Sequence, residues 1–459
     1  MADSSKPKFK RELFGTDGVR GTANQYPMTC EVALALGRAV AHMSKSGNHR
    51  HRIVIGKDTR VSGYMIEMAF ASGVCSMGVD ALLLGPMPTP AVAHLTRDMR
   101  ADAGVMISAS HNPYEDNGIK IFGRDGYKLP DEMEYQLEQW ARGDAIEHIR
   151  PTKDQVGKAF RIDDARGRYI ARLKQVMPPE IDLAGMRIVV DCAHGAAYKV
   201  APTVLEELGA KVFPIGVNPD GHNINDGVGA MFPRKLGDAV KAHGADIGLA
   251  LDGDADRLIV VDEFGAPVDG DAVLGLAARQ LHRVGQLKND EIAVTVMSNL
   301  ALDGFLKKEG VAVTRTQVGD RYVVEAMREK GLCLGGEQSG HLVFLDHATT
   351  GDGMVAALNL LTLLRREDAL VSEMSRLYEP YPQSLVNVQV RAKPPIETLE
   401  DVQKAVEVAE HALGASGRVM VRYSGTESKA RVLVEGPNRA EVESIAQTIA
   451  GALRVAIGA

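Results

Sequence analysis

The segment RIVIGKDTRVSGYMIEMAFASGVCSMGVDALLLG, residues 52–85, decides the fold class. It begins with the short apolar run RIVIG, continues with a helical segment that ends at Gly78, and closes with a second apolar run, VDALLLG. Short β-branched runs that alternate with helical segments closed by glycine are typical of βαβ units. The segment therefore predicts two parallel strands joined by a right-handed helical crossover.

The same order of elements occurs in two further regions. RIVVD (187–191) precedes a helical segment and the run AKVFPIG (210–216), and IAVTV (292–296) precedes a helical segment and the run VAVTRTQVG (311–319). The spacing between the three regions is irregular, which excludes a solenoid. We therefore expect three related α/β domains.

The carboxy-terminal part follows a different pattern. Three strand-like runs, SLVNVQV (384–390), RVMVR (418–422) and RVLVE (431–435), alternate with a helix over roughly 396–413 and a final helix. This order predicts a smaller α+β domain. The four expected domains cover residues 1–158, 159–265, 266–373 and 374–459.

The composition is that of an ordinary globular protein and excludes several functions. Of 459 residues, 45% are hydrophobic and 25% are charged, and the net charge of −7 argues against a general nucleic-acid or membrane-surface binder. The four cysteines have no CxxC spacing, so we expect reduced thiols in a cytoplasmic protein. No signal-peptide stretch opens the chain, and no run approaches the ~18 apolar residues of a membrane span.

Three aspartates follow the apolar run GADIGLAL at alternate positions. Asp252, Asp254 and Asp256 can face one point, because alternate residues of an extended segment point the same way. Their mutual repulsion is costly without a partner, and a hard cation such as Mg²⁺ takes oxygen ligands. A calcium hand is excluded, because Arg257 stands where that motif needs glycine. A solvated acidic turn is the simpler alternative, but apolar strands flank this loop on both sides.

A serine and a histidine follow another apolar strand, GVMIS (104–108). Ser110 and His111 begin a polar turn there. Such residues are good turn formers, and neither a triad nor a Gly-x-Ser-x-Gly elbow surrounds them. Taken alone, this turn is more often structural than catalytic.

The loop GGEQSGH (335–341) offers donors and acceptors. Glu337, Ser339 and His341 suit the recognition of sugar hydroxyls, although a glycine-rich turn is the better interpretation of this motif alone.

The loop RYSGTE (422–427) resembles an anion cradle. Arg422, Ser424, Gly425 and Thr426 offer a guanidinium, hydroxyls and a backbone amide, and Arg431 on the following strand can join them. A serine, a three-carboxylate metal site, a polyol-binding loop and a phosphate cradle are the parts needed to move a phosphoryl group on a sugar phosphate.

Four motifs carry a family resemblance. SASHNP (108–113), DGDADR (252–257), GGEQSGH and RYSGTE occur in the order of the four active-site loops of the α-D-phosphohexomutase superfamily, which the chain resembles over essentially its whole length. The stretches LFGTDGVRG (13–21), GGEQSGH, VGDRYV (318–323) and the SGTE core make it most similar to the bacterial phosphoglucosamine mutase family. The resemblance implies three α/β domains with mixed sheets and a carboxy-terminal α+β domain, in a heart-shaped architecture around a central cleft.

The chain departs from the family pattern at three positions. Tyr423 and Ser428 stand where prolines are common, and Ala255 stands where glycine is common. The loss of two prolines is expected to loosen the phosphate loop, which bears on sugar preference and not on reaction type.

The resemblance also implies a metal centre and a phosphoryl carrier. Ser110 would work as phosphoserine, and one Mg²⁺ would be held by Asp252, Asp254, Asp256 and an oxygen of the serine or its phosphate. The phosphoryl group would pass to the sugar phosphate to give a 1,6-bisphosphate, which also primes the enzyme, and the other phosphate would return to Ser110.

Proton transfer requires a further group. By resemblance Lys120 is the general acid/base, with His111 as a helper and with Arg20 and Arg257 beside the phosphoserine. A lysine works as a base only if burial or nearby cations lower its pKa. A charge partner for the phosphoserine is an equal alternative for Lys120.

The implied reaction is the interconversion of glucosamine 6-phosphate and glucosamine 1-phosphate, on the route to UDP-N-acetylglucosamine. The nearest alternative is the same chemistry on mannose or glucose phosphates. A silent sugar-phosphate binder is disfavoured because every chemical position is filled, and a metal phosphatase because its nucleophile motif is missing. The expected partner is a small-molecule sugar phosphate, without nucleic acid or membrane, and the expected state is a monomer or homodimer.

Overall fold

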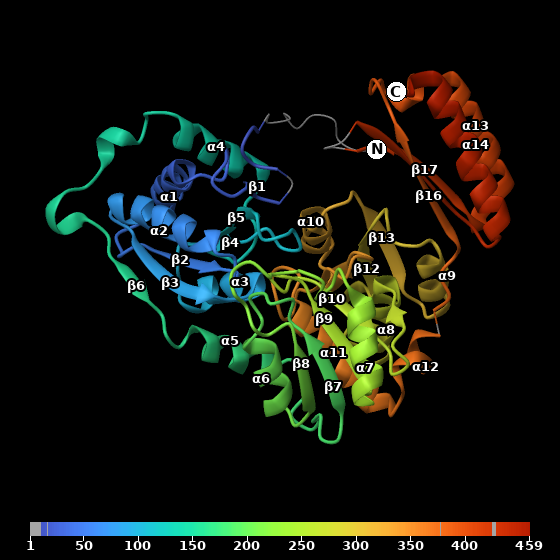
Figure 1. Cartoon of the computed structure of the whole chain (residues 1–459), viewed down its shortest axis with the longest axis horizontal. Helices are drawn as coiled ribbons and strands as arrows, with labels where there is room; N and C mark the ends of the chain where they lie inside the picture. Colours follow the sequence, from blue (N-terminus) through green and yellow to red (C-terminus); the bar gives the residue numbers. More distant parts are fainter. Residues whose placement is uncertain (1–10, 16, 377, 425–427) are drawn as a thin grey trace. The chain divides into compact units, whose positions relative to one another are not determined.

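The computed structural model describes residues 11–15, 17–376, 378–424 and 428–459 (Figure 1). The chain divides into two compact units. The first contains Met1–Met297 and Val313–Ser375, and the second contains Ser298–Ala312 and Arg376–Ala459. Among the described residues, no helix combines the length and the apolar character needed to span a membrane.

A six-stranded mixed sheet opens the first unit. Its order is β1 (Val19–Thr22), β5 (Asp116–Gly123), β4 (Ala103–Ile107), β2 (Arg52–Lys57), β3 (Asp80–Pro86) and β6 (Ala159–Arg161). β2 pairs in parallel with both β3 and β4, whereas β5 runs antiparallel to β4 and β1. The predicted strand–helix–strand unit at 52–85 is thus confirmed, with α2 (Ser62–Ser76) as its crossover.

Helices cover both faces of this sheet (Figure 1). On one face, α1 (Cys30–Ser44), α2 and α4 (Asp131–Arg142) share a hydrophobic cluster with Ile53 and Ile55 of β2. On the other face lies α3 (Thr89–Asp98), where a Cβ on Gly56 would meet the Val92 side chain at 2.4 Å. Two short 3₁₀ turns, Glu147–Ile149 and Lys153–Gln155, precede β6, and α5 (Ala165–Lys174) follows it.

The second sheet of the first unit has five strands. Its order is β11 (Pro267–Val268), β10 (Leu258–Val261), β9 (Ile247–Leu251), β7 (Arg187–Asp191) and β8 (Lys211–Ile215), with helices α6 (Val200–Glu207) and α7 (Pro233–His243). β7 is parallel to β8 and β9, and β10 returns antiparallel to β9. This hairpin places DGDADR at the carboxyl end of β9.

The third sheet has four strands. Its order is β13 (Ala312–Thr316), β12 (Glu291–Thr295), β14 (Leu334–Gly336) and β15 (Leu342–Phe344). The accompanying helices are α8 (Gly270–Arg283), α10 (Asp320–Lys330), α11 (Gly353–Glu367) and α12 (Val371–Ser375), with a 3₁₀ turn at Lys288–Asp290. Asp352 caps α11, because its carboxylate accepts hydrogen bonds from the first backbone N–H groups of that helix.

The second unit is a three-stranded antiparallel sheet with helices. β18 (Lys429–Glu435) lies between β16 (Gln383–Gln389) and β17 (Arg418–Tyr423), and Val432 and Val434 pack with residues of α13 (Glu400–Leu413) and α14 (Arg439–Ile457). Short 3₁₀ turns lie at Ile396–Thr398 and Gly414–Ser416. The smaller α+β region and the three mixed α/β sheets confirm the predicted fold class.

One crossover helix belongs to the second unit instead of the first. α9 (Ala301–Lys308) follows Asn299, whose amide donates to the Tyr381 carbonyl at 2.9 Å, and Leu300, whose N–H donates to Glu435 at 3.1 Å. The predicted domain limits at 158, 265 and 373 remain a prediction.

Candidate active site

The three aspartates occupy the hairpin turn between β9 and β10. Asp252 and Asp254 are fully buried and Asp256 is 4% exposed. One carboxylate oxygen from each lies within 4.8 Å of the others. Ala255 adopts a φ of 59°, a left-handed conformation that favours glycine, so the departure from the family pattern falls on a strained position. The predicted convergence of the three carboxylates is present in the structure.

Burial and neighbouring charges shift the pKa values of two of these carboxylates in opposite directions. Burial, followed by repulsion from Asp256 and Asp254, raises the pKa of Asp252 well above its usual value. Burial opposes ionisation of Asp256 too, but Lys120 and His341 outweigh it and hold its pKa well below the usual value. Oδ1 of Asp254 and Oδ1 of Asp256 are buried and accept no hydrogen bond. Buried oxygen atoms left over in this way fit a hard divalent cation.

Ser110 contacts this cluster from the first sheet. Its hydroxyl donates a hydrogen bond to Asp252 Oδ2 at 2.6 Å, and the side chain is nearly inaccessible. The residue lies beyond the carboxyl end of β4 with a φ of 52°. A Cβ on Gly253 would meet the Ser110 carbonyl oxygen at 2.5 Å, so only glycine permits this approach of the two loops. The serine and the aspartates therefore share one buried pocket.

A fully buried arginine holds the serine loop. The Arg60 guanidinium donates to the carbonyl oxygens of Ser110 at 3.0 Å and Asn112 at 2.8 Å. It also donates to the carbonyl oxygens of Pro113 and Asp116. Asp58 balances its charge, with Nε of Arg60 2.8 Å from Asp58 Oδ2.

Two further side chains, those of Asn225 and Ser108, fix the same loop. Asn225, from the second sheet region, donates to the Ser110 and Asn112 carbonyl oxygens at 2.9 and 3.0 Å. Ser108 accepts from the Ser110 N–H at 2.9 Å and donates to Asp58 at 2.6 Å. The unusual backbone of Ser110 is thus held from several sides, as strained functional residues require.

Lys120 on β5 points into the acidic cluster. Its Nζ lies 2.8 Å from Asp254 Oδ2, 3.4 Å from Asp256 Oδ2 and 3.3 Å from Asp17 Oδ2. Burial opposes protonation, but Asp17, Asp254 and Asp256 outweigh it and raise the pKa of Lys120 well above its usual value. These carboxylates therefore hold Lys120 as an ammonium, and its two expected roles, general acid/base and charge partner of the phosphoserine, both remain predictions.

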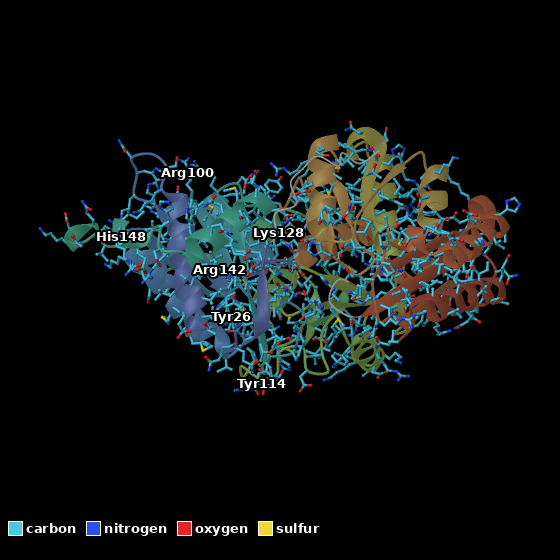
Figure 2. The ribbon with its side chains drawn as sticks, turned by 90° about the horizontal axis from the view of Figure 1, so that it is seen from above. Tyr26, Arg100, Tyr114, Lys128, Arg142 and His148 are labelled. Atoms are coloured by element: carbon cyan, nitrogen blue, oxygen red, sulfur yellow. The ribbon has the colours of Figure 1, made fainter. Side chains whose placement is uncertain are left out.

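Arg20 on β1 and Asp17 extend this network. The Arg20 guanidinium donates to Asp17, and Asp17 also accepts from Lys128, labelled in Figure 2. Burial lowers the pKa of Arg20, but Asp17, Asp254 and Asp256 outweigh it, so that the pKa is raised. Arg20 therefore stays cationic beside the serine loop.

His111 lies next to Ser110 and is half-buried. Its Nδ1 is 3.3 Å from the Ser110 hydroxyl oxygen. Burial, with the nearby guanidinium groups of Arg257 and Arg20, lowers the pKa of His111 to about 4. The imidazole is thus neutral near pH 7 and able to accept a proton.

Arg257 and the GGEQSGH loop flank the cluster. The Arg257 side chain is 25% exposed, so its cation reaches solvent. Glu337 accepts from the Gly319 N–H at 3.0 Å and from the Ser339 hydroxyl at 3.2 Å. A Cβ on Gly340 would meet the Leu258 carbonyl oxygen at 2.2 Å, so this glycine lets the loop pack on β10.

His341 is more deeply placed than the rest of that loop. Its Nδ1 lies 3.7 Å from Asp256 Oδ1 and its Nε2 lies 3.4 Å from Asp320 Oδ2. Burial lowers its pKa, but these two carboxylates outweigh burial and raise the pKa to about 9. The imidazolium supports the aspartate turn, and its predicted contact with substrate remains a prediction.

The anion cradle belongs to the second unit. Arg422 of β17 stands opposite Arg431 of β18 in the antiparallel register. Burial, followed by repulsion from Arg431, lowers the pKa of Arg422. Ser424 is buried, and its N–H donates to the Lys429 carbonyl at 2.8 Å. Gly425 and Thr426, the other predicted cradle residues, lie outside the described residues.

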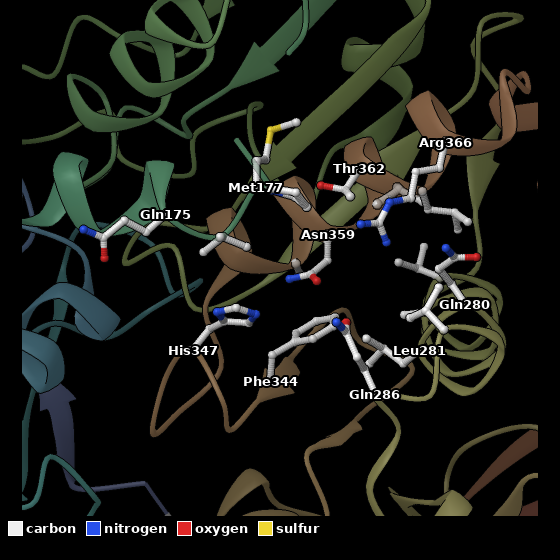
Figure 3. Close-up of a pocket in the computed structure, with 18 of the residues that line it drawn as sticks. Gln175, Met177, Gln280, Leu281, Gln286, Phe344, His347, Asn359, Thr362 and Arg366 are labelled. Carbon is white, nitrogen blue, oxygen red and sulfur yellow. The ribbon is translucent and has the colours of Figure 1, made fainter. Parts of the chain in front are cut away.

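A separate apolar pocket of about 280 Å³ lies between α8, α11 and the segment after α5. Figure 3 shows Met177, Leu281 and Phe344 around it, with Asn359 among them. Among the described residues that line it there is no carboxylate, and none comes from the four motifs. This pocket therefore lacks the acidic groups that converge at the aspartate turn.

Three residues that hold the serine loop lie outside the four family motifs. Asp58, Arg60 and Asn225 support the serine loop, yet KDTR at 57–60 has the composition of an ordinary charged surface turn. The available signal was its position, directly after a buried strand of the first sheet, where loops gather at the carboxyl ends of parallel strands.

Family models match four consecutive parts of the chain. The alpha/beta/alpha domains I, II and III of phosphoglucomutase/phosphomannomutase match residues 11–145, 167–265 and 269–381. The C-terminal domain of the same family matches residues 385–452.

Curated relatives match over nearly the full length. Phosphoglucosamine mutase of Anaeromyxobacter dehalogenans (strain 2CP-C) is 60% identical over 456 residues, which cover 98% of this chain and 100% of the relative. Phosphoglucosamine mutase of Myxococcus xanthus (strain DK1622) is 58% identical over 447 residues, which cover 97% and 98%.

Solved structures share the fold. A phosphoglucomutase/phosphomannomutase family protein from Burkholderia thailandensis superposes with a TM-score of 0.80 at 23% identity, over 96% of this chain and 97% of the other. Aspergillus fumigatus N-acetylphosphoglucosamine mutase, in complex with GlcNAc-6P and magnesium, superposes with a TM-score of 0.67 at 19% identity, over 97% and 96%. At such identities the likeness concerns the fold alone.

Proposed function

The chain belongs to the phosphoglucomutase/phosphomannomutase family and, within it, to the phosphoglucosamine mutases, and from this premise we propose that it interconverts glucosamine 6-phosphate and glucosamine 1-phosphate. It is an isomerase of the phosphohexomutase type. The observation that carries the proposed mechanism is the 2.6 Å hydrogen bond between the Ser110 hydroxyl and Asp252, because it joins a nucleophile to a carboxylate cluster suited to a cation.

Ser110 is the proposed phosphoryl carrier. In the first half-reaction the bond from phosphorus to the Ser110 oxygen breaks and a bond to the sugar hydroxyl oxygen forms. The sugar hydroxyl gives its proton to a neighbouring base, and the Ser110 oxygen takes up a proton. The product is a sugar 1,6-bisphosphate. In the second half-reaction the other phosphoryl group returns to Ser110, so that no net phosphate is released and a trace of bisphosphate suffices as primer.

Asp252, Asp254 and Asp256, with the Ser110 oxygen or its phosphate, would hold one Mg²⁺. The two buried Oδ1 atoms that accept no hydrogen bond support this assignment. When bound, the ion neutralises the charge that accumulates during phosphoryl transfer. It would also relieve the mutual repulsion that raises the pKa of Asp252.

Lys120 and His111 divide the proton chemistry in this proposal. The ammonium of Lys120, kept protonated by three carboxylates, can donate to the leaving Ser110 oxygen or pair with the phosphoserine. The neutral imidazole of His111, 3.3 Å from the same hydroxyl, can accept a proton. Arg20 and Arg257 supply positive charge for the phosphoryl oxygens.

The remaining loops bind the rest of the substrate. Glu337, Ser339 and His341 are proposed to recognise the sugar hydroxyls. The arginine pair Arg422 and Arg431, with Ser424, Gly425 and Thr426, is proposed to grip the phosphate that is not reacting. Binding energy from such a remote group can position the reacting end.

A sugar-phosphate panel tests the substrate. Purified enzyme with Mg²⁺ and a trace of hexose 1,6-bisphosphate is incubated with glucosamine 6-phosphate, mannose 6-phosphate or glucose 6-phosphate, and ³¹P NMR follows the products. We expect glucosamine 1-phosphate to form fastest. Faster turnover of mannose or glucose phosphate would replace this assignment with the neighbouring mutase activity, and accumulation of inorganic phosphate would indicate a phosphatase.

A mass measurement tests the carrier. Intact-protein mass spectrometry should show a fraction heavier by one phosphoryl group in the wild type, absent in Ser110→Ala. The same variant should lose about 10⁴-fold or more in kcat, as when a covalent nucleophile is removed. Ser72→Ala, an exposed serine on α2, is the matched control and should keep both properties. Full turnover by Ser110→Ala would end the phosphoserine mechanism.

A further inference from the structure

A second cluster of side chains that can ligate a metal lies at the amino-terminal ends of strands β2 and β4 of the first sheet. His49 Nε2 is 2.9 Å from Asp102 Oδ1, and His51 Nδ1 is 3.3 Å from Asp102 Oδ2. One ligand atom from each of the three residues lies within 4.8 Å of the others. The two imidazole rings are 4.3 Å apart between centroids and inclined by 61°. Two ring nitrogens thus converge on one carboxylate.

Hydrogen bonds of the neighbouring residues hold this convergence in place. His49 and His51 are two residues apart, and Arg50 between them directs its guanidinium to Asp80, with Nε 2.8 Å from the carboxylate. The imidazoles on either side of Arg50 both contact the Asp102 carboxylate. Asp102 is itself held, because its Oδ2 accepts from the Arg52 N–H at 3.0 Å and its own N–H donates to the Arg52 carbonyl at 2.9 Å.

We infer that His49, His51 and Asp102 form a binding site for a divalent transition-metal ion of the zinc class. Two imidazole nitrogens and one carboxylate oxygen are the three protein ligands of many zinc sites that leave a fourth position to water. The floor of the cluster is enclosed and its outer side is open, since the Asp102 and His51 side chains are 7% and 11% exposed and that of His49 is 48% exposed. An ion has both an entry path and a preset carboxylate.

This site is separate from the aspartate turn in place and in chemistry. Asp102 precedes β4 and the serine loop follows it, so the five residues of the strand, at ~3.3 Å each, keep the two sites roughly 16 Å apart. The aspartate turn offers only oxygen atoms, which suit Mg²⁺, whereas imidazole nitrogen favours zinc, copper or nickel. The bound ion would tie the segment before β2 to the start of β4. It is not required for phosphoryl transfer.

Zinc binding to the full-length, tag-free protein tests this site. Isothermal titration calorimetry with zinc chloride is run in excess Mg²⁺, which occupies the aspartate turn. We expect one zinc ion per wild-type chain at this site and a loss of affinity of more than about tenfold in His49→Gln and Asp102→Asn. His282→Gln is the matched control, because His282 also pairs with an aspartate, Asp290 at 2.8 Å, but has no second imidazole in that pair.

Two outcomes decide the inference. Zinc should raise the unfolding temperature of the wild type and of His282→Gln but not that of His49→Gln. The mutase rate of all three proteins should stay the same. A zinc-edge anomalous difference map should show a peak between His49, His51 and Asp102. Equal zinc stoichiometry and affinity in wild type and His49→Gln, or an anomalous map without a peak there, would overturn it. In that case the three residues serve only to tie the chain together by hydrogen bonds.

Discussion

In two clusters of this protein the neighbouring side chains carry charges of the same sign, negative in one cluster and positive in the other. The surroundings of the two clusters differ. The aspartate turn is buried and has fixed cationic partners on neighbouring elements, chiefly Lys120 and His341. The pair Arg422 and Arg431 stands across two strands of a small sheet and is only partly buried. Each cluster repels itself, and each suits a counter-ion of opposite sign. In the proposed function the acidic cluster holds a resident cation, and the basic cluster binds a ligand phosphate that exchanges.

Asp252→Asn breaks the acidic side of this comparison, with the largest expected effect. The substitution removes one of three carboxylates, so Mg²⁺ affinity and transition-state stabilisation fall together, and kcat should fall by about 10³-fold. In EDTA the same variant should unfold at a higher temperature than the wild type, because a buried carboxylate that repels its neighbours is gone. Steady-state kinetics across Mg²⁺ concentrations and thermal unfolding with and without EDTA measure both effects.

The opposite signs of these two effects are the essential result. An excess of Mg²⁺ should remove the stability advantage of Asp252→Asn, since the ion compensates the wild-type cluster. If the variant is less stable than the wild type in EDTA, repulsion among the aspartates is not the dominant force in the metal-free pocket.

Arg60→Lys tests whether the serine loop needs its guanidinium. Lysine keeps the charge opposite Asp58 but lacks the planar fork of five donors, so several buried carbonyl oxygens lose their partners. Stability should fall by about 2–4 kcal/mol. A misplaced Ser110 should lower kcat by about 10²-fold with little change in KM.

Asn225→Ala sharpens this test. It removes donors to the same Ser110 and Asn112 carbonyl oxygens but leaves the Arg60 pair intact, so its effects on stability and kcat should be smaller. Urea unfolding and steady-state kinetics measure both variants. An Arg60→Lys enzyme that loses stability but keeps kcat would show that the arginine stabilises the fold without positioning the serine.

The sequence predicts the elements accurately where periodicity and glycine mark them. The expected strand, helix and strand at 52–85 match β2, α2 and β3 within about two residues, in line with the usual uncertainty of boundaries. It does not predict that α9 clusters with the second unit. That grouping depends on hydrogen bonds from Asn299 to Tyr381 and from Leu300 to Glu435, which join residues 82 and 135 positions apart.

The site shows the same limit. The motifs indicate the convergence of Asp252, Asp254 and Asp256, because alternation along an extended segment is a local property. The pKa of Lys120 is not local, since it depends on Asp17, which reaches the pocket from another part of the first sheet. The role of Arg60 could not be predicted from the sequence for a similar reason, because its burial depends on a loop more than forty residues away.

Arg422→Ala breaks the basic side of the comparison, with a smaller effect. Loss of a charge-assisted hydrogen bond to phosphate costs about 1.5–3 kcal/mol, so kcat/KM for the sugar phosphate should fall by about 10- to 100-fold, largely through KM. Stability should change little or rise, because Arg431 loses a like-charged neighbour. Arg439→Ala, at an exposed position of α14 in the same unit, is the control and should keep KM. An unchanged KM in Arg422→Ala would remove this residue from the phosphate grip.

Asp352→Asn sharpens the comparison by testing a buried carboxylate that needs no ion. Burial raises the pKa of Asp352 to about 6, while a hydrogen bond from the Tyr169 hydroxyl at 2.6 Å and bonds from the first N–H groups of α11 oppose the rise. Because the folded-state pKa exceeds the ordinary value of 3.8, the stability this group contributes is fully present below pH 3.8 and is lost as pH rises through about 6. Asparagine preserves the cap and carries no charge, so the free energy of unfolding of the variant should exceed that of the wild type by up to about 3 kcal/mol between pH 4 and pH 7.

Urea unfolding across this pH range measures the difference, which should be the same with Mg²⁺ and with EDTA, unlike that of Asp252→Asn. If this stability difference changed with Mg²⁺, the charge of Asp352 would be coupled to the aspartate turn. Asp352, whose charge is stabilised by hydrogen bonds of the fold, could then no longer be distinguished from Asp252, whose charge is stabilised by an ion.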